Sequence, residues 1–278
     1  MNRSAILEDL SRRLPGGVED AAITGLALRG VGTVDKTLLR AQSRTGSWAA
    51  VAGGPPNTYL TALSLLTLRR SHDPQALQAC ARSLKWLQDC HPVESHWLWK
   101  WKFRLADRQV RFDPSKYGWP WVPGTVSWVA PTALSVLTLR AHGVASDRIP
   151  IAEAMLLDRA CPAGGWNAGN SSVFGVNLDA HPDFTAMALL ALANSPHAQT
   201  PIISSAAEYL SVRLATCQSA YSLAWGTMAL AALGDARAAK YRRRLERMDA
   251  HDRWPTRTLG LVALALEDPI FTFKEFAK

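Results

Sequence analysis

The sequence lacks most of the signals that mark a cofactor enzyme, a metalloprotein or a nucleic-acid-binding protein. Its four cysteines lie far apart and include no Cys-x-x-Cys pair, so neither a disulfide framework nor a zinc site of the usual spacing is expected. It contains no Gly-rich phosphate loop, no nucleophile elbow and no nucleic-acid-binding motif. We therefore expect no cofactor, no bound metal and no nucleic-acid partner.

Long apolar runs are also missing. The longest, from Phe184 to Ala193, is shorter than the roughly 18–20 residues that a membrane-spanning helix needs, and we interpret it as a buried helix. The amino-terminal apolar stretch contains Glu8 and Asp9, which a secretory signal would not carry. A cytoplasmic location is therefore expected, and any contact with the inner membrane would be peripheral.

The residues that are abundant are apolar and basic. With 48% hydrophobic and 19% charged residues, the chain can bury a sizeable core, and we expect residues 1–278 to form a single domain. The net charge is +8, and its densest basic run lies at 238–247. Such a run is either the solvated face of an outer helix or a site for phosphate groups.

One pattern of small and large apolar residues recurs along the chain. It is found in five segments, which begin at Thr61, Thr132, Thr185, Leu223 and Leu259. Amphipathic segments alternate with them, at 33–42, 74–88, 150–160, 201–218 and 236–248. Buried helices that alternate with amphipathic ones predict an all-α fold, an α/α toroid of five to six helix pairs, with residues 1–14 and 22–30 as the sixth. An open solenoid of helical hairpins is the alternative.

The connecting loops are similar to a known repeat. Residues 38–48 contain Gln42, Gly46 and Trp48 in the order Gln-x-x-x-Gly-x-Trp, and partial copies occur at 118–128, 161–170 and 216–225. They resemble the QW motif of the prenyltransferase/squalene oxidase repeat superfamily, which includes squalene–hopene cyclases and protein-prenyltransferase β subunits. Over about residues 33–266 this resemblance implies a toroid scaffold and an isoprenoid or lipid ligand. Because relatives pair two domains or two subunits, a homodimer or a second subunit is also compatible with one toroid.

The longest gap between buried segments, an insertion at about 91–128, is rich in tryptophan. Trp97, Trp99, Trp101 and Phe103 alternate with Lys100, Lys102 and Arg104, which predicts a strand that pairs with 108–112 in a Trp-rich β-hairpin. The resemblance implies an aromatic pocket wall that shields a cationic intermediate. We assign this wall to Trp99, Trp101, Trp119, Trp121 and Trp166. The alternative is a lid that only packs on the end of the barrel.

Candidate chemistry lies at the start of the third buried segment. Class II terpenoid cyclases protonate their substrate with an Asp-x-Asp-Asp motif followed by Thr-Ala, and the matching stretch here is 181–186. The resemblance implies that Asp183 is the acid, and a neutral His181 would accept a hydrogen bond from it. His181 and Phe184 replace the flanking carboxylates. The alternative is that Asp183 is only the N-cap of a helix.

Three functions follow from these patterns. The first is a terpenoid-cyclase-like enzyme that starts cyclisation of a polyprenyl substrate by protonation in an apolar, aromatic-lined pocket. The second is a non-catalytic toroid that binds a lipid or a protein and has lost the acid motif. The third is a prenyltransferase-type subunit, although the Asp-x-Cys zinc ligands of that branch are absent. In the carboxyl-terminal segment, Phe271, Phe273 and Phe276 would form either a membrane anchor or a clasp on the barrel.

Overall fold

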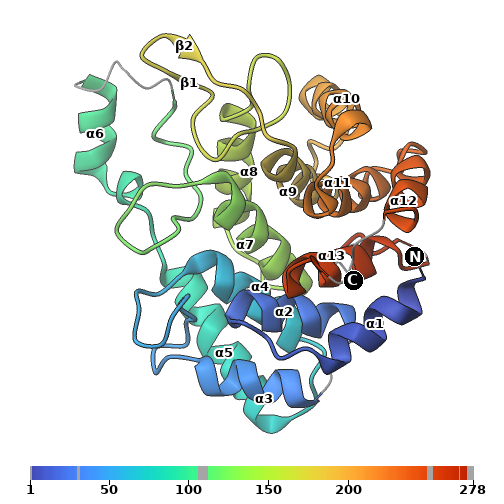
Figure 1. The fold of residues 1–278 in the computed structure, drawn as a ribbon. Coiled ribbons are helices and arrows are strands. Elements are labelled where there is room, and N and C mark those ends of the chain that lie inside the picture. The colour runs from blue at the N-terminus through green and yellow to red at the C-terminus, as the bar shows by residue number, and fades with distance from the viewer. Residues whose placement is uncertain (1, 30–31, 106–111, 249–252, 269, 274–278) are drawn as a thin grey trace.

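The computed structural model describes residues 2–29, 32–105, 112–248, 253–268 and 270–273, and its elements are almost all helices (Figure 1). Six inner helices carry the buried segments: α2 (Val18–Ala27), α4 (Thr58–Leu68), α7 (Val129–Ala141), α9 (Pro182–Leu192), α11 (Ala220–Ala232) and α13 (Thr256–Ala265). Six outer helices alternate with them: α1 (Arg3–Arg12), α3 (Gly32–Ala41), α5 (Pro74–Asp89), α8 (Arg148–Asp158), α10 (Pro201–Thr216) and α12 (Ala238–Glu246). The connections add α6 (Trp97–Leu105), the 3-10 turn η1 (Val93–Ser95) and the short strands β1 (Ser172–Val173) and β2 (Val176–Asn177).

The inner helices form a closed ring. Each contacts the next in the order α2, α4, α7, α9, α11 and α13, and α13 returns to contact α2. An open solenoid would leave its first and last helices apart, so this contact confirms the α/α toroid and excludes the solenoid. The six pairs include the expected sixth pair, α1 with α2.

Small and hydroxyl-bearing residues let the inner helices approach one another closely. A Cβ atom on Gly226 of α11 would lie 2.4 Å from Cδ1 of Leu214 on the outer helix α10, so a larger residue there would have to displace this leucine side chain. The Thr67 hydroxyl donates to the carbonyl oxygen of Ala22 on α2 at 2.8 Å. Some of these buried hydroxyls are therefore satisfied by a neighbouring helix, whereas those of Thr24, Ser64 and Ser135 have no hydrogen-bond partner among the described residues.

Three tryptophans repeat one structural role in the loops that enter inner helices. Each indole N–H donates to a carbonyl oxygen in the last turn of an outer helix: Trp48 to Leu38 at 2.8 Å, Trp119 to Leu87 at 2.8 Å and Trp166 to Leu156 at 2.6 Å. Each backbone N–H donates to a threonine hydroxyl of the next inner helix: Trp48 to Thr61, Trp119 to Thr132 and Trp166 to Thr185. The indole N–H thus donates a hydrogen bond to a carbonyl oxygen that the outer helix leaves free, and the backbone N–H anchors the tryptophan to the start of the next inner helix.

The insertion differs from its prediction. Residues 97–105 form α6 rather than the first strand of a hairpin, and residues 106–111 lie outside the described part of the chain. Trp99 is 38% exposed and Trp101 is 65% exposed, so the prediction that both face the barrel is wrong. The physical reason is that a strand needs a partner for its backbone groups, whereas a helix satisfies them internally.

The basic run and the carboxyl-terminal phenylalanines have structural roles. On α12, Arg244 donates to the carbonyl oxygens of Leu214 and Ala215 at the end of α10, at 2.6 and 2.8 Å.

Phe271 and Phe273 are buried, and the Phe273 ring stacks on Trp225 with 6.3 Å between centroids. These two phenylalanines therefore act as a clasp, while Phe276 lies outside the described residues. No helix in the described part of the chain is long and apolar enough to cross a membrane.

Candidate functional site

A cavity of about 350 Å³ lies where the inner helices begin. Its lining combines apolar and aromatic side chains with two carboxyl groups: Glu19, Ala50, Asn57, Tyr59, Leu60, Trp121, Ala130, Asp183, Phe184, Met187 and Tyr221. We call it the central cavity. Apolar walls with a few polar groups are typical of small-molecule sites.

The titratable side chains of the central cavity lie at equivalent positions in four of the repeats. Glu19, Tyr59, Asp183 and Tyr221 are each the second residue of an inner helix, α2, α4, α9 and α11 respectively. Because these helices start at the same end of the ring, the repeat brings the four side chains to one level. In the order of the ring, α2 and α9 lie opposite each other, so Glu19 and Asp183 approach from opposite sides.

Asp183 is not the N-cap of α9. That position belongs to His181, whose side chain makes no capping hydrogen bond, and Asp183 lies in the first turn. Asp183 Oδ1 is buried, and no group among the described residues donates a hydrogen bond to it. Burial raises the pKa of Asp183, while a hydrogen bond from Ser222 and the charge of His181 act in the opposite direction. Asp183 is therefore a partly desolvated carboxyl group with one unengaged oxygen in an apolar cavity.

Glu19 belongs to a hydrogen-bonded chain on the other side. The Tyr59 hydroxyl donates to Glu19 Oε1 at 3.2 Å, and the hydroxyls of Tyr59 and Tyr221 are hydrogen bonded to each other. Burial raises the pKa of Glu19, although the charge of Arg257 lowers it. Burial also raises the pKa of Tyr221 to about 12, so this hydroxyl keeps its proton at neutral pH.

The structure brings together only part of the predicted site. Trp121 lines the central cavity, and its ring centroid lies 5.3 Å from that of Tyr59. Trp119 and Trp166 are fully buried in the loop positions described above, and Trp99 and Trp101 belong to α6. His181 is exposed at the start of α9, with its ring edge-on to Phe184 at 6.1 Å.

The residues predicted from the sequence do not include the other titratable residues of the central cavity, which are Glu19, Tyr59 and Tyr221. A signal for them exists in the repeat itself. Asp183, Tyr59 and Tyr221 each stand two residues before a recurring apolar octapeptide, at Thr185, Thr61 and Leu223 respectively. Glu19 stands two residues before residues 21–28, which follow the same pattern but were not among the five segments.

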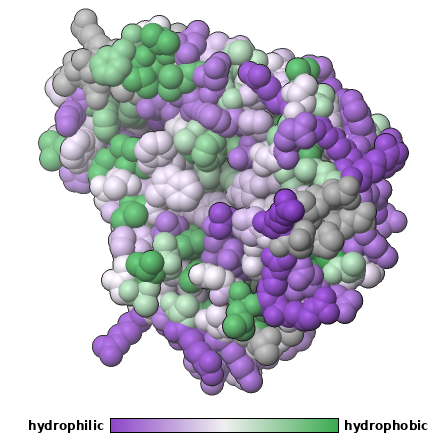
Figure 2. Space-filling view, in the orientation of Figure 1, coloured by the Kyte–Doolittle hydropathy of each residue, from purple (hydrophilic) through white to green (hydrophobic). Residues whose placement is uncertain are grey.

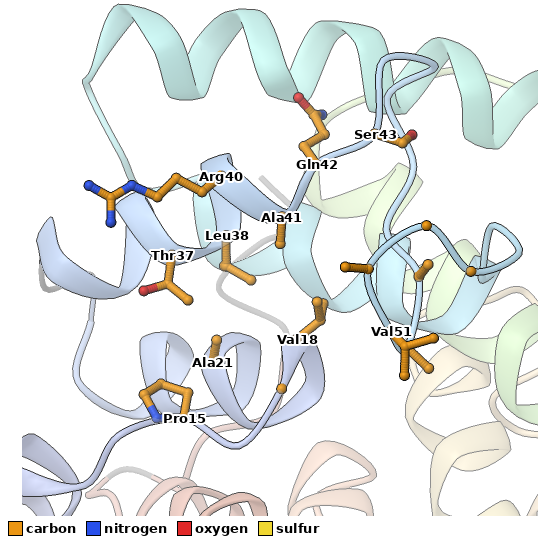
Figure 3. Close-up of a pocket in the computed structure, with 16 residues that line it drawn as sticks. Pro15, Val18, Ala21, Thr37, Leu38, Arg40, Ala41, Gln42, Ser43 and Val51 are labelled. Carbon is orange, nitrogen blue, oxygen red and sulfur yellow. The ribbon is translucent and has the colours of Figure 1, made fainter.

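A second cavity, of about 510 Å³, lies between α2, α3 and the loop 49–54 (Figure 3). Val18, Leu38, Ala41 and Val51 surround it, whereas the Arg40 side chain extends away. Its lining contains no carboxyl group. It therefore lacks acid–base chemistry, and the smaller central cavity is the candidate functional site. No group of three or more potential metal ligands occurs among the described residues.

The fold is shared with proteins of several kinds. No protein-family model matches the chain, and neither does any curated protein sequence. Type II terpene cyclase MstE from Scytonema is 16% identical over 95% of each chain, with a TM-score of 0.56. A protein from Actinoplanes is 15% identical over 95% of this chain and 98% of that chain, with a TM-score of 0.55. Alpha-2-macroglobulin from Escherichia coli is 14% identical over 96% of this chain but only 42% of that chain, with a TM-score of 0.52.

These likenesses define a class of fold rather than an activity. At such identities the shared feature is the helical toroid, and a toroid can carry unrelated functions. The chain therefore has a terpenoid-cyclase-like fold, and what it does has to be inferred from the central cavity.

The pKa shift at Asp183 predicts a pH-dependent stability. A carboxyl group whose pKa is raised by folding stabilises the fold below its unfolded pKa, and this contribution is lost as the pH rises through the folded pKa. Asp183→Asn should therefore be more stable than wild type at neutral pH, by on the order of 1 kcal/mol, a typical size for the effect of one substitution, because asparagine carries no charge to desolvate. The gain should shrink as the pH falls, which urea unfolding over a pH series would measure.

A matched control separates this effect from capping. Asp73 is a true N-cap, since its side chain accepts from the Gln75 N–H at 2.8 Å. Asp73→Asn keeps a good cap and should give no gain in the free energy of unfolding at neutral pH. Equal behaviour of the two variants would mean that Asp183 is not strained by burial.

Proposed function

We propose that the protein is a terpenoid-cyclase-like enzyme that cyclises a polyprenyl substrate after protonating it in the central cavity. The observation that carries this proposal is Asp183, a carboxyl group with raised pKa and an unengaged buried oxygen among apolar and aromatic side chains. A general acid works best when its pKa approaches the operating pH, and burial moves Asp183 in that direction.

The proposed reaction is an isomerisation, in which the substrate gains one proton and the cyclised cation loses one. Asp183 donates a proton to an alkene carbon of the substrate, and the π electrons form the new C–H bond, which leaves a tertiary carbocation. Further alkenes of the chain attack this cation and close rings. A base then removes a proton, so that the product is an isomer of the substrate. Glu19, opposite Asp183 in the ring, is a base of suitable chemistry, and the Tyr59–Tyr221 pair connects its side of the cavity with α11. After product release, Glu19 gives its proton to water and Asp183 takes one up from water, which restores both groups.

The aromatic rings of the cavity fit a cationic intermediate. Tyr59, Trp121 and Phe184 present ring faces or edges around the cavity, and the face of an aromatic ring attracts a cation. The cavity volume of about 350 Å³ is at the small end of ligand sites. We infer a short polyprenyl chain rather than a triterpene.

A single toroid is sufficient for this proposal. The described neighbour MstE is a type II terpene cyclase, and this chain and MstE cover 95% of each other. This likeness supports a site within one toroid.

The alternative is a non-catalytic binding toroid. It is favoured by the replacement of two motif carboxylates by His181 and Phe184. It is also favoured by the same fold in alpha-2-macroglobulin from Escherichia coli. In this case the central cavity would hold an apolar ligand without changing it.

Incubation of the purified protein with linear polyprenyl alcohols, diphosphates and prenylated aromatics tests the proposal. We expect a product of unchanged mass and altered retention, identified as cyclic by NMR, from at least one short substrate. Recovery of every substrate unchanged, together with saturable binding of one of them, would establish the binding toroid instead.

A further inference from the structure

Large apolar side chains are exposed on two segments at one end of the toroid. They are Trp97, Leu98 and Trp101 on α6, and Phe174, Val176 and Leu178 on or beside the β1–β2 hairpin, each between 40% and 71% exposed. Apolar surface gathers at the upper left of the molecule in Figure 2, where Figure 1 shows the β1–β2 hairpin, with α6 beside it. We call these six residues the apolar rim.

The two segments adjoin each other and the mouth of the ring. Phe103 of α6 and Asn170, just before β1, line the same small cavity of about 180 Å³. The segment α6 lies in the connection from α5 to α7, and the hairpin lies in the connection from α8 to α9. Both connections lead into the starts of inner helices, which is the end where the central cavity lies.

The hairpin holds its phenylalanine outward in an unfavourable backbone conformation. Phe174 and Gly175 form the two-residue turn between the paired Val173 and Val176, with φ values of +52° and +78°. A bulky residue rarely adopts positive φ, and glycine or asparagine would fit the turn better. Because Phe174 is 71% exposed, packing within the chain does not compensate for this strain.

The charge on α6 is positive, which favours an acidic partner over a basic or neutral one. Residues 97–103 include Lys100 and Lys102 and no acidic residue. The Lys102 ammonium lies 4.4 Å from the Trp99 ring centroid. The hairpin segment carries one exposed acidic residue close to the rim, Asp179, which directly follows Leu178 in the chain. Tryptophan prefers the interface between water and lipid, and lysine beside it favours anionic headgroups.

We propose that the apolar rim docks the protein on the surface of an anionic phospholipid bilayer. The indoles of α6 and the hairpin tip enter the headgroup region, and Lys100 and Lys102 contact lipid phosphates. The contact is peripheral and does not depend on what the central cavity does. It turns the starts of the inner helices toward the membrane, from which an apolar ligand would arrive.

Flotation of the full chain with vesicles tests this surface. Wild type should float with vesicles of phosphatidylcholine and phosphatidylglycerol, and less with phosphatidylcholine alone or at high salt. The double variant Trp97→Ser, Trp101→Ser should partition about ten-fold more weakly, because its exposed indoles are removed. Phe174→Asn should also bind more weakly, and asparagine tolerates the positive φ.

Matched controls make the outcome decisive. Ile202 and Val212 are exposed apolar residues on α10, and the double variant Ile202→Ser, Val212→Ser should float like wild type. Vesicle binding of the rim variants equal to wild type would overturn the proposal. So would a wild-type chain that ignores vesicles and forms a dimer that the same rim substitutions dissociate.

Discussion

Asp183→Asn is expected to abolish product formation from any polyprenyl substrate that the wild type cyclises. Asparagine has nearly the same shape but no acidic proton, and general acids contribute about 10²–10⁴-fold to rate. The loss should appear in kcat rather than in substrate binding, because the cavity walls are unchanged. Since Asp183 is not the N-cap of α9, the variant should remain folded. Single-turnover product analysis and equilibrium substrate binding would separate the two effects.

Glu19→Gln is the informative companion variant. If Glu19 is the terminating base, this variant should still consume substrate while its product shifts toward other double-bond isomers or a hydroxylated ring system. Full activity of Asp183→Asn would exclude Asp183 as the acid, whatever the behaviour of Glu19→Gln. Loss of both activities together with loss of substrate binding would indicate a structural defect rather than lost chemistry.

Trp166→Ala is expected to destabilise the fold strongly, whereas Trp101→Ala is expected to leave it nearly unchanged. Trp166 is fully buried, and its indole occupies the Leu156 carbonyl at 2.6 Å. Truncation of such a side chain costs roughly 3–5 kcal/mol, which should lower the melting temperature by roughly 10 °C in a chain of this size. Trp101 is 65% exposed, and its removal should change the free energy of unfolding by less than about 0.5 kcal/mol.

Thermal and urea unfolding of both variants would test this contrast. The comparison separates tryptophans that hold the repeat together from tryptophans on its surface, although both kinds occur in similar aromatic loops of the sequence. Similar losses of stability in the two variants would contradict the assignment of Trp166 to the scaffold and of Trp101 to the rim.

The helical part of the fold could be predicted because its information is local. An apolar octapeptide buried on every side must be an inner helix, and an amphipathic segment must cover it. The five predicted segments begin within the inner helices α4, α7, α9, α11 and α13, each three residues after the helix starts. The alternation in residues 97–103 predicts a strand, but a pattern over so short a stretch does not say whether a partner strand exists, and the segment forms α6.

The sequence by itself determined the alternation of inner and outer helices and identified Asp183 as the carboxyl group worth testing, whereas closure of the repeat into a ring was decided by the structure. Only the tertiary structure decided which side chains share the cavity with Asp183. Closure of the ring places Glu19 opposite Asp183, although they are far apart in the chain, and it brings Tyr59 and Tyr221 into contact. Closure also decided the roles of the tryptophans, because burial depends on which loops meet. Trp119 and Trp166 are buried in the scaffold, Trp121 lines the cavity, and Trp99 and Trp101 face outward. A linear pattern records side-chain chemistry at each position but not which other positions the fold brings next to it, and a site is made of such neighbours.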